Sequence, residues 1–233
     1  MSFRRKPPVG NVRRVRSNGQ NLRGVITNKA GRLVQFESWL ERALILRLDR
    51  DPNVQDYQSQ PERFRFTDEQ GRSRSYIPDF RVWRGGQIEI HEVTLSKRRM
   101  RPDLQRRETA ARRICNERGW SYVLHTEQTL PQPGELANLL ALAGYRPTIY
   151  ANEWITRTVV ELLRTNQGST LDGLVGQVEQ KLALPEQQIT GTICHLLWSG
   201  RLQTNLEQLL FDQGTILPGI SVWLGPEEAN DVA

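Results

Sequence analysis

The sequence predicts an α/β domain followed by a small α+β domain of three helices and a β-hairpin. An amphipathic helical stretch comes first, strand-like segments surround one basic helix over residues 62–127, and the composition changes after Pro147. The chain has 233 residues, 37% of them apolar, which is enough for two cores. We expect a basic arm over residues 1–30, an α/β domain over 31–146, a second domain over 147–225 and a flexible acidic tail over 226–233.

The first domain is expected to follow the order α-β-β-β-α-β. In "VQFESWLERALILRLDRDP", Phe36, Leu40, Leu44 and Leu48 recur at spacing four, and the Asp51-Pro52 pair stops the helix. Three predicted strands follow, in "ERFRFT", "SYIPDFRVW" and "IEIHEVTL". A basic helix over about 102–118, a strand in "WSYVLHTE" and a short helix in "PGELANLLALAGY" complete the domain.

The pattern of the second domain predicts a winged helix. Helices are expected in "NEWITRTVVELLRTNQG", in "STLDGLVGQVEQKL" with Ser169 or Thr170 as N-cap, and in "LPEQQITGTICHLLWSG", followed by a wing in "RLQTNLEQLLFDQGTILPG". A third helix that reads a DNA groove should be basic, but this one carries Glu186, Gln187 and Gln188 and reaches no Lys or Arg before Arg201. We therefore favour a protein-docking role over groove binding, and this argues against a winged-helix transcription regulator.

Charge and composition favour an acidic partner. The formal charge of +6 and a pI near 9.7 indicate nucleic acid before membrane. Residues 1–32 contain nine Lys or Arg and no acid, which suits either a solvated tail or an arm laid on phosphates. Two distant cysteines indicate a reducing compartment without structural zinc, and no apolar run approaches the roughly 18 residues of a spanning helix. We expect a cytoplasmic protein.

Two acids in "SYIPDFRVWRGGQIEIHEVTLSKRR" suggest a metal site. Asp79 lies at a strand end and Glu92 on the next strand, with a short turn between, so their carboxylates can meet across the hairpin. Such a pair suits Mg²⁺, which takes few protein oxygens and leaves room for phosphate and water. In the third strand, Glu92 and Thr94 share a face with Ile88 and Ile90. The alternative is a pair of structural or surface acids.

Several motifs together resemble the TnsA endonucleases of heteromeric cut-and-paste transposases. They are "FESWLERALILRLDRDPNVQDYQSQP", "YIPDFRV", "EVT" and "ERGWSYVLHTEQTLPQPGELANLLAL", in that order. The resemblance implies a restriction-endonuclease-like fold of the PD-(D/E)xK type. It also implies Mg²⁺-dependent cleavage of the 5′ (non-transferred) strand at each end of a transposon, with Mn²⁺ as a substitute. The implied partners are double-stranded DNA, a TnsB-like transposase that cuts the 3′ side, and a TnsC-like ATPase engaged through the C-terminal domain. In that complex the protein would be associated with the bacterial nucleoid.

The resemblance also assigns roles to residues. Asp79 matches the metal-binding aspartate and Glu92 the second ligand on the following strand. The helical glutamate is Glu41 or Glu37, four apart on one expected helical face, and Glu41 is preferred. Gln60 matches a recurrent glutamine that shapes the site, although a strand-end polar residue is an equal interpretation.

Thr94 departs from the resemblance, because the family usually has a lysine there. Lys97, three residues later, has a long side chain that can return an ammonium group to the site, or it can simply contact the DNA backbone. A non-catalytic DNA-binding and scaffolding subunit is therefore the alternative function. The arginines expected to bind DNA phosphates are Arg13, Arg14, Arg16, Arg98, Arg99 and Arg101.

Overall fold

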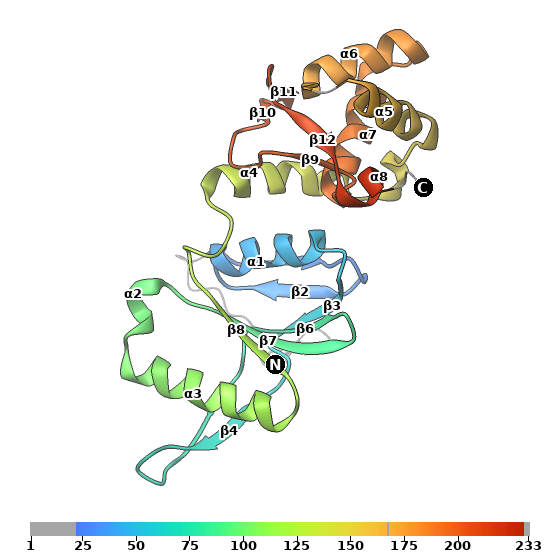
Figure 1. Cartoon of the computed structure of the whole chain (residues 1–233). Helices are drawn as coiled ribbons and strands as arrows, with labels where there is room; N and C mark the ends of the chain where they lie inside the picture. Colours follow the sequence, from blue (N-terminus) through green and yellow to red (C-terminus); the bar gives the residue numbers. More distant parts are fainter. Residues whose placement is uncertain (1–21, 167, 231–233) are drawn as a thin grey trace, which may run out of the picture. The chain divides into compact units, whose positions relative to one another are not determined.

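The computed structural model describes residues 22–166 and 168–230, which fold as two compact units (Figure 1). The first unit extends to Pro131 and the second begins at Gln132. Arg13, Arg14 and Arg16 lie outside the described residues. Within the described ranges, every helix is too short or too polar to cross a bilayer.

The first unit is a mixed α/β fold. Its elements are β1 (Gly24–Thr27), β2 (Leu33–Phe36), α1 (Trp39–Arg50), β3 (Val54–Ser59), β4 (Phe64–Thr67), β5 (Ser73–Tyr76), β6 (Phe80–Arg84), β7 (Gln87–Val93), α2 (Ser96–Arg99), α3 (Pro102–Glu117) and β8 (Ser121–His125). The central sheet has the strand order β3-β6-β7-β8, with β7 and β8 parallel and the other neighbours antiparallel. α1 lies on one side of this sheet and α3 on the other (Figure 1).

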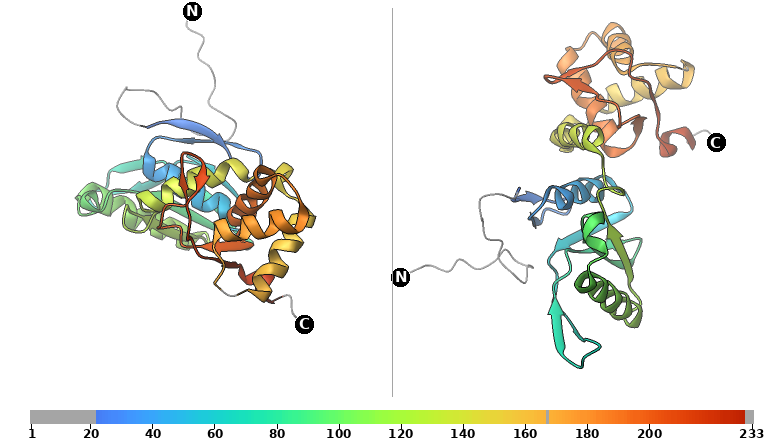
Figure 2. Two further views of the ribbon diagram at one scale, coloured as in Figure 1. Left: turned by 90° about the horizontal axis from the view of Figure 1, so that it is seen from above. Right: turned by 90° about the vertical axis from the view of Figure 1, so that its left-hand side faces the viewer.

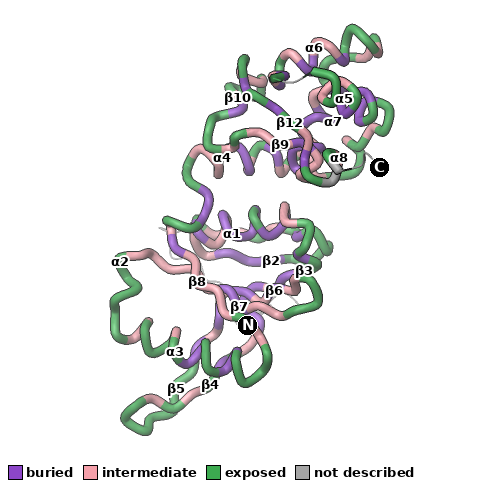
Figure 3. The backbone as a smooth tube through the Cα atoms, in the orientation of Figure 1, coloured by how far each residue is buried: buried purple, intermediate pink, exposed green. Residues whose placement is uncertain are grey.

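The core of this unit consists of two apolar layers that enclose the sheet. α1 contributes Ala43, Leu44 and Leu48, all fully buried. On the α3 side, Ile90 of β7 packs in one cluster with Phe64, Tyr76, Ala111, Ile114 and Cys115. Figure 3 shows this burial concentrated along the sheet strands and the inner faces of the helices. Because consecutive side chains of a strand point to opposite faces, the residues next to Ile90 in β7 face α1.

The beginning of the chain differs from the expectation. Residues 24–27, expected within the basic arm, form β1 and pair with β2. The first helix begins at Trp39, not near Val34, because Ser38 caps it and residues 33–36 are extended. Glu37 therefore precedes the helix cap, and the expectation that Glu37 and Glu41 share a helical face was wrong. The predicted end of this helix at Asp51 is confirmed.

The strand assignment needs two corrections. The sheet begins with β3, in "VQDYQS", which the sequence analysis did not assign as a strand. The segment "ERFRFT" instead forms β4, which pairs with β5 as a separate hairpin that projects from the sheet (Figure 2). The expected single strand "SYIPDFRVW" is divided between β5 and β6, because Pro78 cannot donate to a ladder. The basic helix and the strand after it are confirmed as α3 and β8.

The second unit is mainly helical. Its elements are α4 (Pro133–Leu142), the 3₁₀ turns η1 (Ala143–Tyr145) and η2 (Thr148–Tyr150), α5 (Glu153–Thr165), α6 (Leu171–Leu182), α7 (Glu186–Ser199), β9 (Leu202–Thr204), β10 (Phe211–Asp212), β11 (Thr215–Ile216), β12 (Val222–Leu224) and α8 (Pro226–Asn230). β9 pairs with β12, and β10 with β11. The three expected helices are present as α5, α6 and α7, and Thr170 caps α6. Residues 226–230, expected in a flexible tail, form α8.

α4 belongs to the second unit. Asn138, in α4, is 1% exposed and donates through Nδ2 to the carbonyl oxygens of Leu206 (2.8 Å) and Gln208 (2.7 Å). Its Oδ1 accepts from the backbone N–H of Leu210 at 2.9 Å. One side chain therefore satisfies three backbone groups of the segment between β9 and β10, and it ties that segment to α4.

Each unit contains one buried cysteine. Cys115 is 1% exposed within the α3-side core, and Cys194 in α7 is fully buried. Burial raises the pKa of Cys115 to about 11 and that of Cys194 to about 12. Both thiols are therefore protonated at neutral pH and behave as small apolar groups.

Candidate active site

Glu41 is fixed by the cap of α1. Ser38 Oγ accepts from the backbone N–H of Glu41 (3.1 Å) and donates to its Oε1 (3.0 Å), while Glu41 Oε2 accepts from the backbone N–H of Glu37 at 2.9 Å. This is a variant of the S-x-x-E capping box, in which the carboxylate binds the residue before the cap. The local sequence "ESWLE" thereby holds one carboxylate at the amino end of α1.

Asp79 is fixed at the point where β6 begins. Its Oδ2 accepts from the backbone N–H of Val93, the last residue of β7, at 2.8 Å. Its carbonyl oxygen accepts from the backbone N–H of Gln60, which directly follows β3, at 2.7 Å. Asp79 is therefore anchored to both neighbouring strands of β6, and its position depends on the sheet and not on a loose loop.

Glu41 and Asp79 lie near each other. The pKa of Glu41 is raised to about 7, chiefly because burial disfavours the charged form and next because the negative charge of Asp79 is close. The hydrogen bonds from Glu37 and Ser38 act in the opposite direction but do not offset these effects. Two carboxylates in one partly buried place create a negative potential that attracts a cation.

Gln60 and Glu37 complete this group. Gln60 is 6% exposed, and its Nε2 donates to Glu37 Oε1 at 3.1 Å. The negative charge of Glu37 also contributes to the raised pKa of Glu41. We call Glu37, Glu41, Gln60 and Asp79 the carboxylate cluster. It is assembled from the segment before α1, the first turn of α1, the end of β3 and the start of β6.

Glu92 lies on the α3 side of the sheet, as its shared face with Ile90 predicts. Burial raises its pKa, against the stabilising influence of the neighbouring hydroxyl groups of Tyr76 and Tyr122. The geometry nevertheless falls short of hydrogen bonds: Glu92 Oε1 and both phenol oxygens are buried without a partner within the described residues. The second-ligand role expected for Glu92 stays a prediction.

Thr94 lines a small cavity of about 20 Å³ together with Glu92, and Leu104 and Glu108 of α3 also line it. The backbone N–H of Thr94 donates to the carbonyl of His125 at 3.0 Å. Lys97 is exposed in α2, and the preceding Ser96 donates to the carboxylate of Glu127. A catalytic part for Lys97 stays a prediction.

The three expected DNA-binding arginines that the structure describes are Arg98, Arg99 and Arg101, and all three are exposed. Arg99 lies 3.7 Å from Glu108 and Arg101 lies 3.3 Å from Asp103. Exposed ion pairs of this kind are worth about 0–1 kcal/mol, so they leave the guanidinium groups accessible to phosphates.

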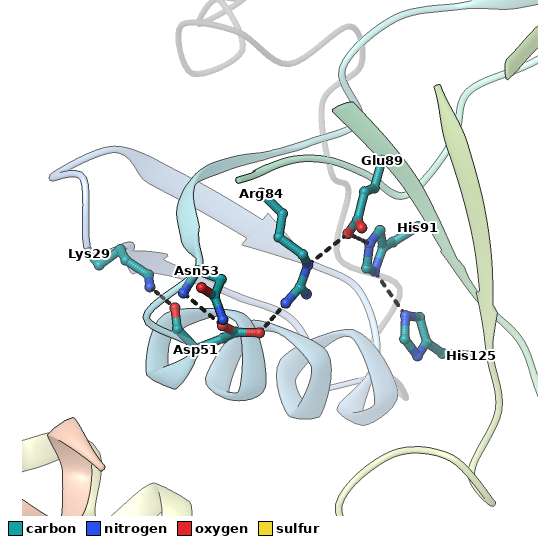
Figure 4. Close-up of polar contacts among 7 residues, drawn as sticks. All are labelled: Lys29, Asp51, Asn53, Arg84, Glu89, His91 and His125. Atoms are coloured by element: carbon teal, nitrogen blue, oxygen red, sulfur yellow. Dashed lines mark hydrogen bonds and ion pairs between the residues drawn. The ribbon is translucent and has the colours of Figure 1, made fainter. Parts of the chain in front are cut away.

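A polar network that the sequence motifs did not predict lies on the α1 side of the sheet (Figure 4). Arg84 forms ion pairs with Asp51 and, at 3.0 Å, with Glu89. Glu89 Oε2 lies 2.8 Å from Nε2 of His91, and His91 Nδ1 lies 2.9 Å from Nε2 of His125. The alternation of Glu89 and His91 in "IEIHEV" places both on one strand face and was the available signal.

The network fixes the protonation of its histidines. Because Nε2 of His91 faces a carboxylate, it carries the proton, and Nδ1 is free to accept from His125. Burial lowers the pKa of both rings. For His125, burial and next the charge that His91 would carry lower the pKa to about 4. A neutral histidine pair thus links β7 to β8 within the sheet that carries Asp79.

Residues 51–127 match a protein family described as TnsA-like endonuclease N terminal. The matched region runs through β3 to β8 and includes Gln60, Asp79 and Glu92, whereas Glu37 and Glu41 lie before it. A comparison with curated proteins finds no match. The resemblance drawn from the sequence motifs is confirmed over residues 51–127, and this region, which carries the mixed sheet, is similar to the TnsA-like endonuclease N-terminal family.

Proposed function

We propose that this chain is the DNA endonuclease subunit of a transposase and cuts the 5′ (non-transferred) strand at transposon ends by metal-assisted phosphodiester hydrolysis. The observation that carries the proposal is that the carboxyl group of Glu41 lies near that of Asp79, a residue of the TnsA-like region. The products would be 5′-phosphate and 3′-hydroxyl ends, as hydrolysis by an activated water leaves them.

The cofactor we propose is Mg²⁺, for which Mn²⁺ substitutes. The donors of the carboxylate cluster are hard oxygen atoms, and its accumulated negative charge fits a divalent cation. When bound, the cation would orient the scissile phosphate, lower the pKa of the attacking water and offset charge that develops on the phosphate. Asp79 supplies a carboxylate oxygen that the hydrogen bond from Val93 keeps in place.

Glu41 is suited to hold the proton of the attacking water. A carboxyl group with a pKa of about 7 can accept a proton at neutral pH and release it again. The cap of α1 restrains both of its oxygen atoms, so little reorganisation is needed. Lys97 would supply the positive charge that Thr94 lacks, from α2, the helix that follows β7.

The DNA would lie against the first unit. Residues 1–131 contain 27 Lys or Arg and 15 Asp or Glu, whereas residues 132–233 contain five Lys or Arg and 11 Asp or Glu. The basic excess therefore belongs entirely to the unit that carries the carboxylate cluster. Arg98, Arg99 and Arg101, with the arm residues Arg13, Arg14 and Arg16, would contact phosphates and give a salt-dependent affinity.

We propose that the second unit is a winged-helix-like module that docks protein. α5, α6 and α7, the β9–β12 pair and the β10–β11 hairpin support that arrangement. Its acidic balance and the first turn of α7, which carries Glu186, suit a protein surface better than a DNA groove. The partners would be a TnsC-like ATPase here and a TnsB-like transposase elsewhere in the complex.

The alternative is a catalytically inactive, TnsA-like DNA-binding and scaffolding subunit. Two observations favour it: Thr94 stands where a lysine is expected, and Glu92 is enclosed beside Tyr76 and Tyr122 on the α3 side. Under this alternative the carboxylate cluster would persist without hydrolysing DNA.

The test reconstitutes excision with the cognate transposase on end-labelled transposon-end DNA in Mg²⁺. We expect the wild type to give both cuts, and Asp79→Ala and Glu41→Gln to lose only the 5′-side cut. Identical 3′-side nicks without any 5′-side cut for the wild type and Asp79→Ala would establish the scaffold instead.

Lys97 needs its own comparison, for which Arg98 is the matched control in the same helix. Lys97→Ala should lower the single-turnover rate of the 5′-side cut without changing DNA affinity, because its ammonium would act on the reacting phosphate. Arg98→Ala should weaken DNA binding and reduce the salt dependence of that binding. Equal effects of the two variants on affinity alone would make Lys97 a backbone contact.

A further inference from the structure

Gln60 has an unusual backbone. Its φ of 49° lies in the left-handed region, where residues other than glycine, asparagine and aspartate are uncommon. It stands between β3 and Pro61, and in this conformation its N–H reaches the carbonyl of Asp79 at 2.7 Å. Strain of this kind persists where the surroundings impose it, and it is concentrated at functional sites. Here it brings the side chain of Gln60 into the carboxylate cluster.

In the side-chain amide of Gln60, the nitrogen has a hydrogen-bond partner and the oxygen has none among the described residues. Nε2 donates to Glu37 Oε1 at 3.1 Å, which fixes the orientation, because the reversed amide would place its oxygen against a carboxylate oxygen. Oε1 is buried and has no hydrogen-bond partner among the described residues. A buried carbonyl oxygen without a partner is costly, so a cation or water bound at this place would stabilise it.

The charged residues alone do not complete a cation site. Within residues 22–166 and 168–230, no three side chains of His, Cys, Asp or Glu come together as a metal site. The cluster nevertheless combines Glu41 and Asp79 with an amide oxygen that lacks a partner. Glu92, the other expected oxygen donor, is enclosed on the α3 side with two phenols. The oxygen that is buried, neutral and unpartnered within the cluster belongs to Gln60.

We propose that Gln60 Oε1 is a ligand of the divalent cation, together with a carboxylate oxygen of Asp79. This rests on the proposed metal-dependent function of the same cluster. An amide carbonyl is a hard oxygen donor that Mg²⁺ and Mn²⁺ accept, and it adds a ligand without adding a further negative charge. Glu37 acts as the positioning residue, since it holds Nε2 and thereby directs Oε1.

Binding of Mn²⁺ to the full-length protein without DNA tests the proposal, measured by the loss of the free-ion signal in electron paramagnetic resonance. The main variant is Gln60→Gly, because glycine adopts a φ of 49° without strain and the variant removes the whole side chain with its amide. We expect Gln60→Gly to weaken Mn²⁺ binding at least about tenfold. Glu92→Gln should bind like the wild type, and Asp79→Asn should lose binding.

Gln60→Glu distinguishes a ligand from a purely structural amide. A carboxylate at this position keeps an oxygen for the cation, so Mn²⁺ affinity should equal or exceed that of the wild type. The new carboxylate repels Glu37 and lowers the metal-free thermal stability in either case, so Mn²⁺ affinity is the deciding measurement. If the amide served only to donate to Glu37, that affinity would fall as well. Gln60→Glu also keeps the proposal testable if Gln60→Gly fails to fold.

The possible failures are distinct. Wild-type affinity in Gln60→Gly, with binding lost in Asp79→Asn, would overturn the role of Gln60 and leave the proposed metal site intact. Loss of binding in Glu92→Gln with none in Gln60→Gly would return the ligand role to Glu92. Absence of saturable Mn²⁺ binding by the wild type would overturn both this inference and the metal-dependent function.

Discussion

The carboxylate of Asp79 opposes the ionisation of Glu41, although Asp79 stands at the start of β6 and Glu41 in the first turn of α1. Asp79→Asn should therefore lower the pKa of Glu41 from about 7, without restoring the ordinary 4.5, because burial is the larger cause. A carbon-detected NMR titration of the Glu41 carboxyl measures this. Asp103→Asn, a change at a partly exposed residue of α3, serves as control, and an unshifted Glu41 pKa in Asp79→Asn would contradict the relationship.

The free energy of unfolding should depend on pH through Glu41 and His125, whose contributions change in opposite directions. Glu41 has a raised pKa, so its contribution is full below about 4.5 and is lost as the pH rises through about 7. His125 has a lowered pKa, so its contribution is present above 6.5 and is lost as the pH falls through about 4. The two slopes offset each other in the wild type over the shared range.

Single variants should reveal each slope. In metal-free denaturant titrations between pH 4.5 and 6.5, the free energy of unfolding of Glu41→Gln should rise with pH. That of His125→Gln should fall with pH over the same range. Parallel profiles for the two variants would show that one of the groups does not titrate as its burial predicts.

Thr94→Lys should lower the free energy of unfolding, whatever its effect on catalysis. The side chain enters a cavity of about 20 Å³ beside Glu92, and overpacking of this kind costs about 1–3 kcal/mol. The new ammonium group should also lower the pKa of Glu92, which burial holds above its ordinary value. Thr94→Val, which nearly conserves volume, is the control. An unchanged Glu92 pKa in an NMR titration would place the lysine outside the cavity.

Asn138→Ala should destabilise the second unit by about 3 kcal/mol or more, since it leaves three backbone groups without partners. Denaturant unfolding followed by tryptophan fluorescence, to which the buried Trp198 of α7 contributes, measures the loss. Asn205→Ala, an exposed change in the same segment, is the control. Equal stabilities of the two variants would mean that α4 does not support this segment.

The contacts of α4 also predict where the second unit can be separated. A fragment of residues 132–233 should fold cooperatively, whereas a fragment of 147–233, which starts at the boundary expected from composition, should not. Circular dichroism during thermal unfolding compares them. A cooperative transition in the fragment of 147–233 would mean that the second domain begins near residue 147, as the composition predicts.

Local signals in the sequence were enough for much of the fold. The spacing of the leucines in α1, the proline that begins α3 and the glycine after it, and the helices of the second unit all follow from periodicity and caps. β3 escaped prediction because "VQDYQS" carries few apolar residues, although Val54 and Tyr57 are buried. Its strand character comes from pairing with β6, which a local pattern does not contain.

The sequence predicted which residues form the candidate site better than it predicted how those residues are arranged. The motifs pointed to Asp79, Glu41 and Gln60, which the structure brings together. The sequence did not reveal that Glu37 precedes the helix cap, nor that Gln60 adopts a left-handed conformation. The first fact follows from the local cap that Ser38 forms with Glu41. The second depends on contacts between distant segments, such as the bond from Gln60 Nε2 to Glu37.

Each unit contains one buried thiol, and the reactivity of that thiol reports whether its unit is folded. Cys115 and Cys194 are the only two cysteines of the chain, and both are shielded in the folded state. A maleimide added to the native protein should therefore react only when the surrounding unit opens. Mass spectrometry of the two tryptic peptides would then time the opening of each unit separately, without any engineered label.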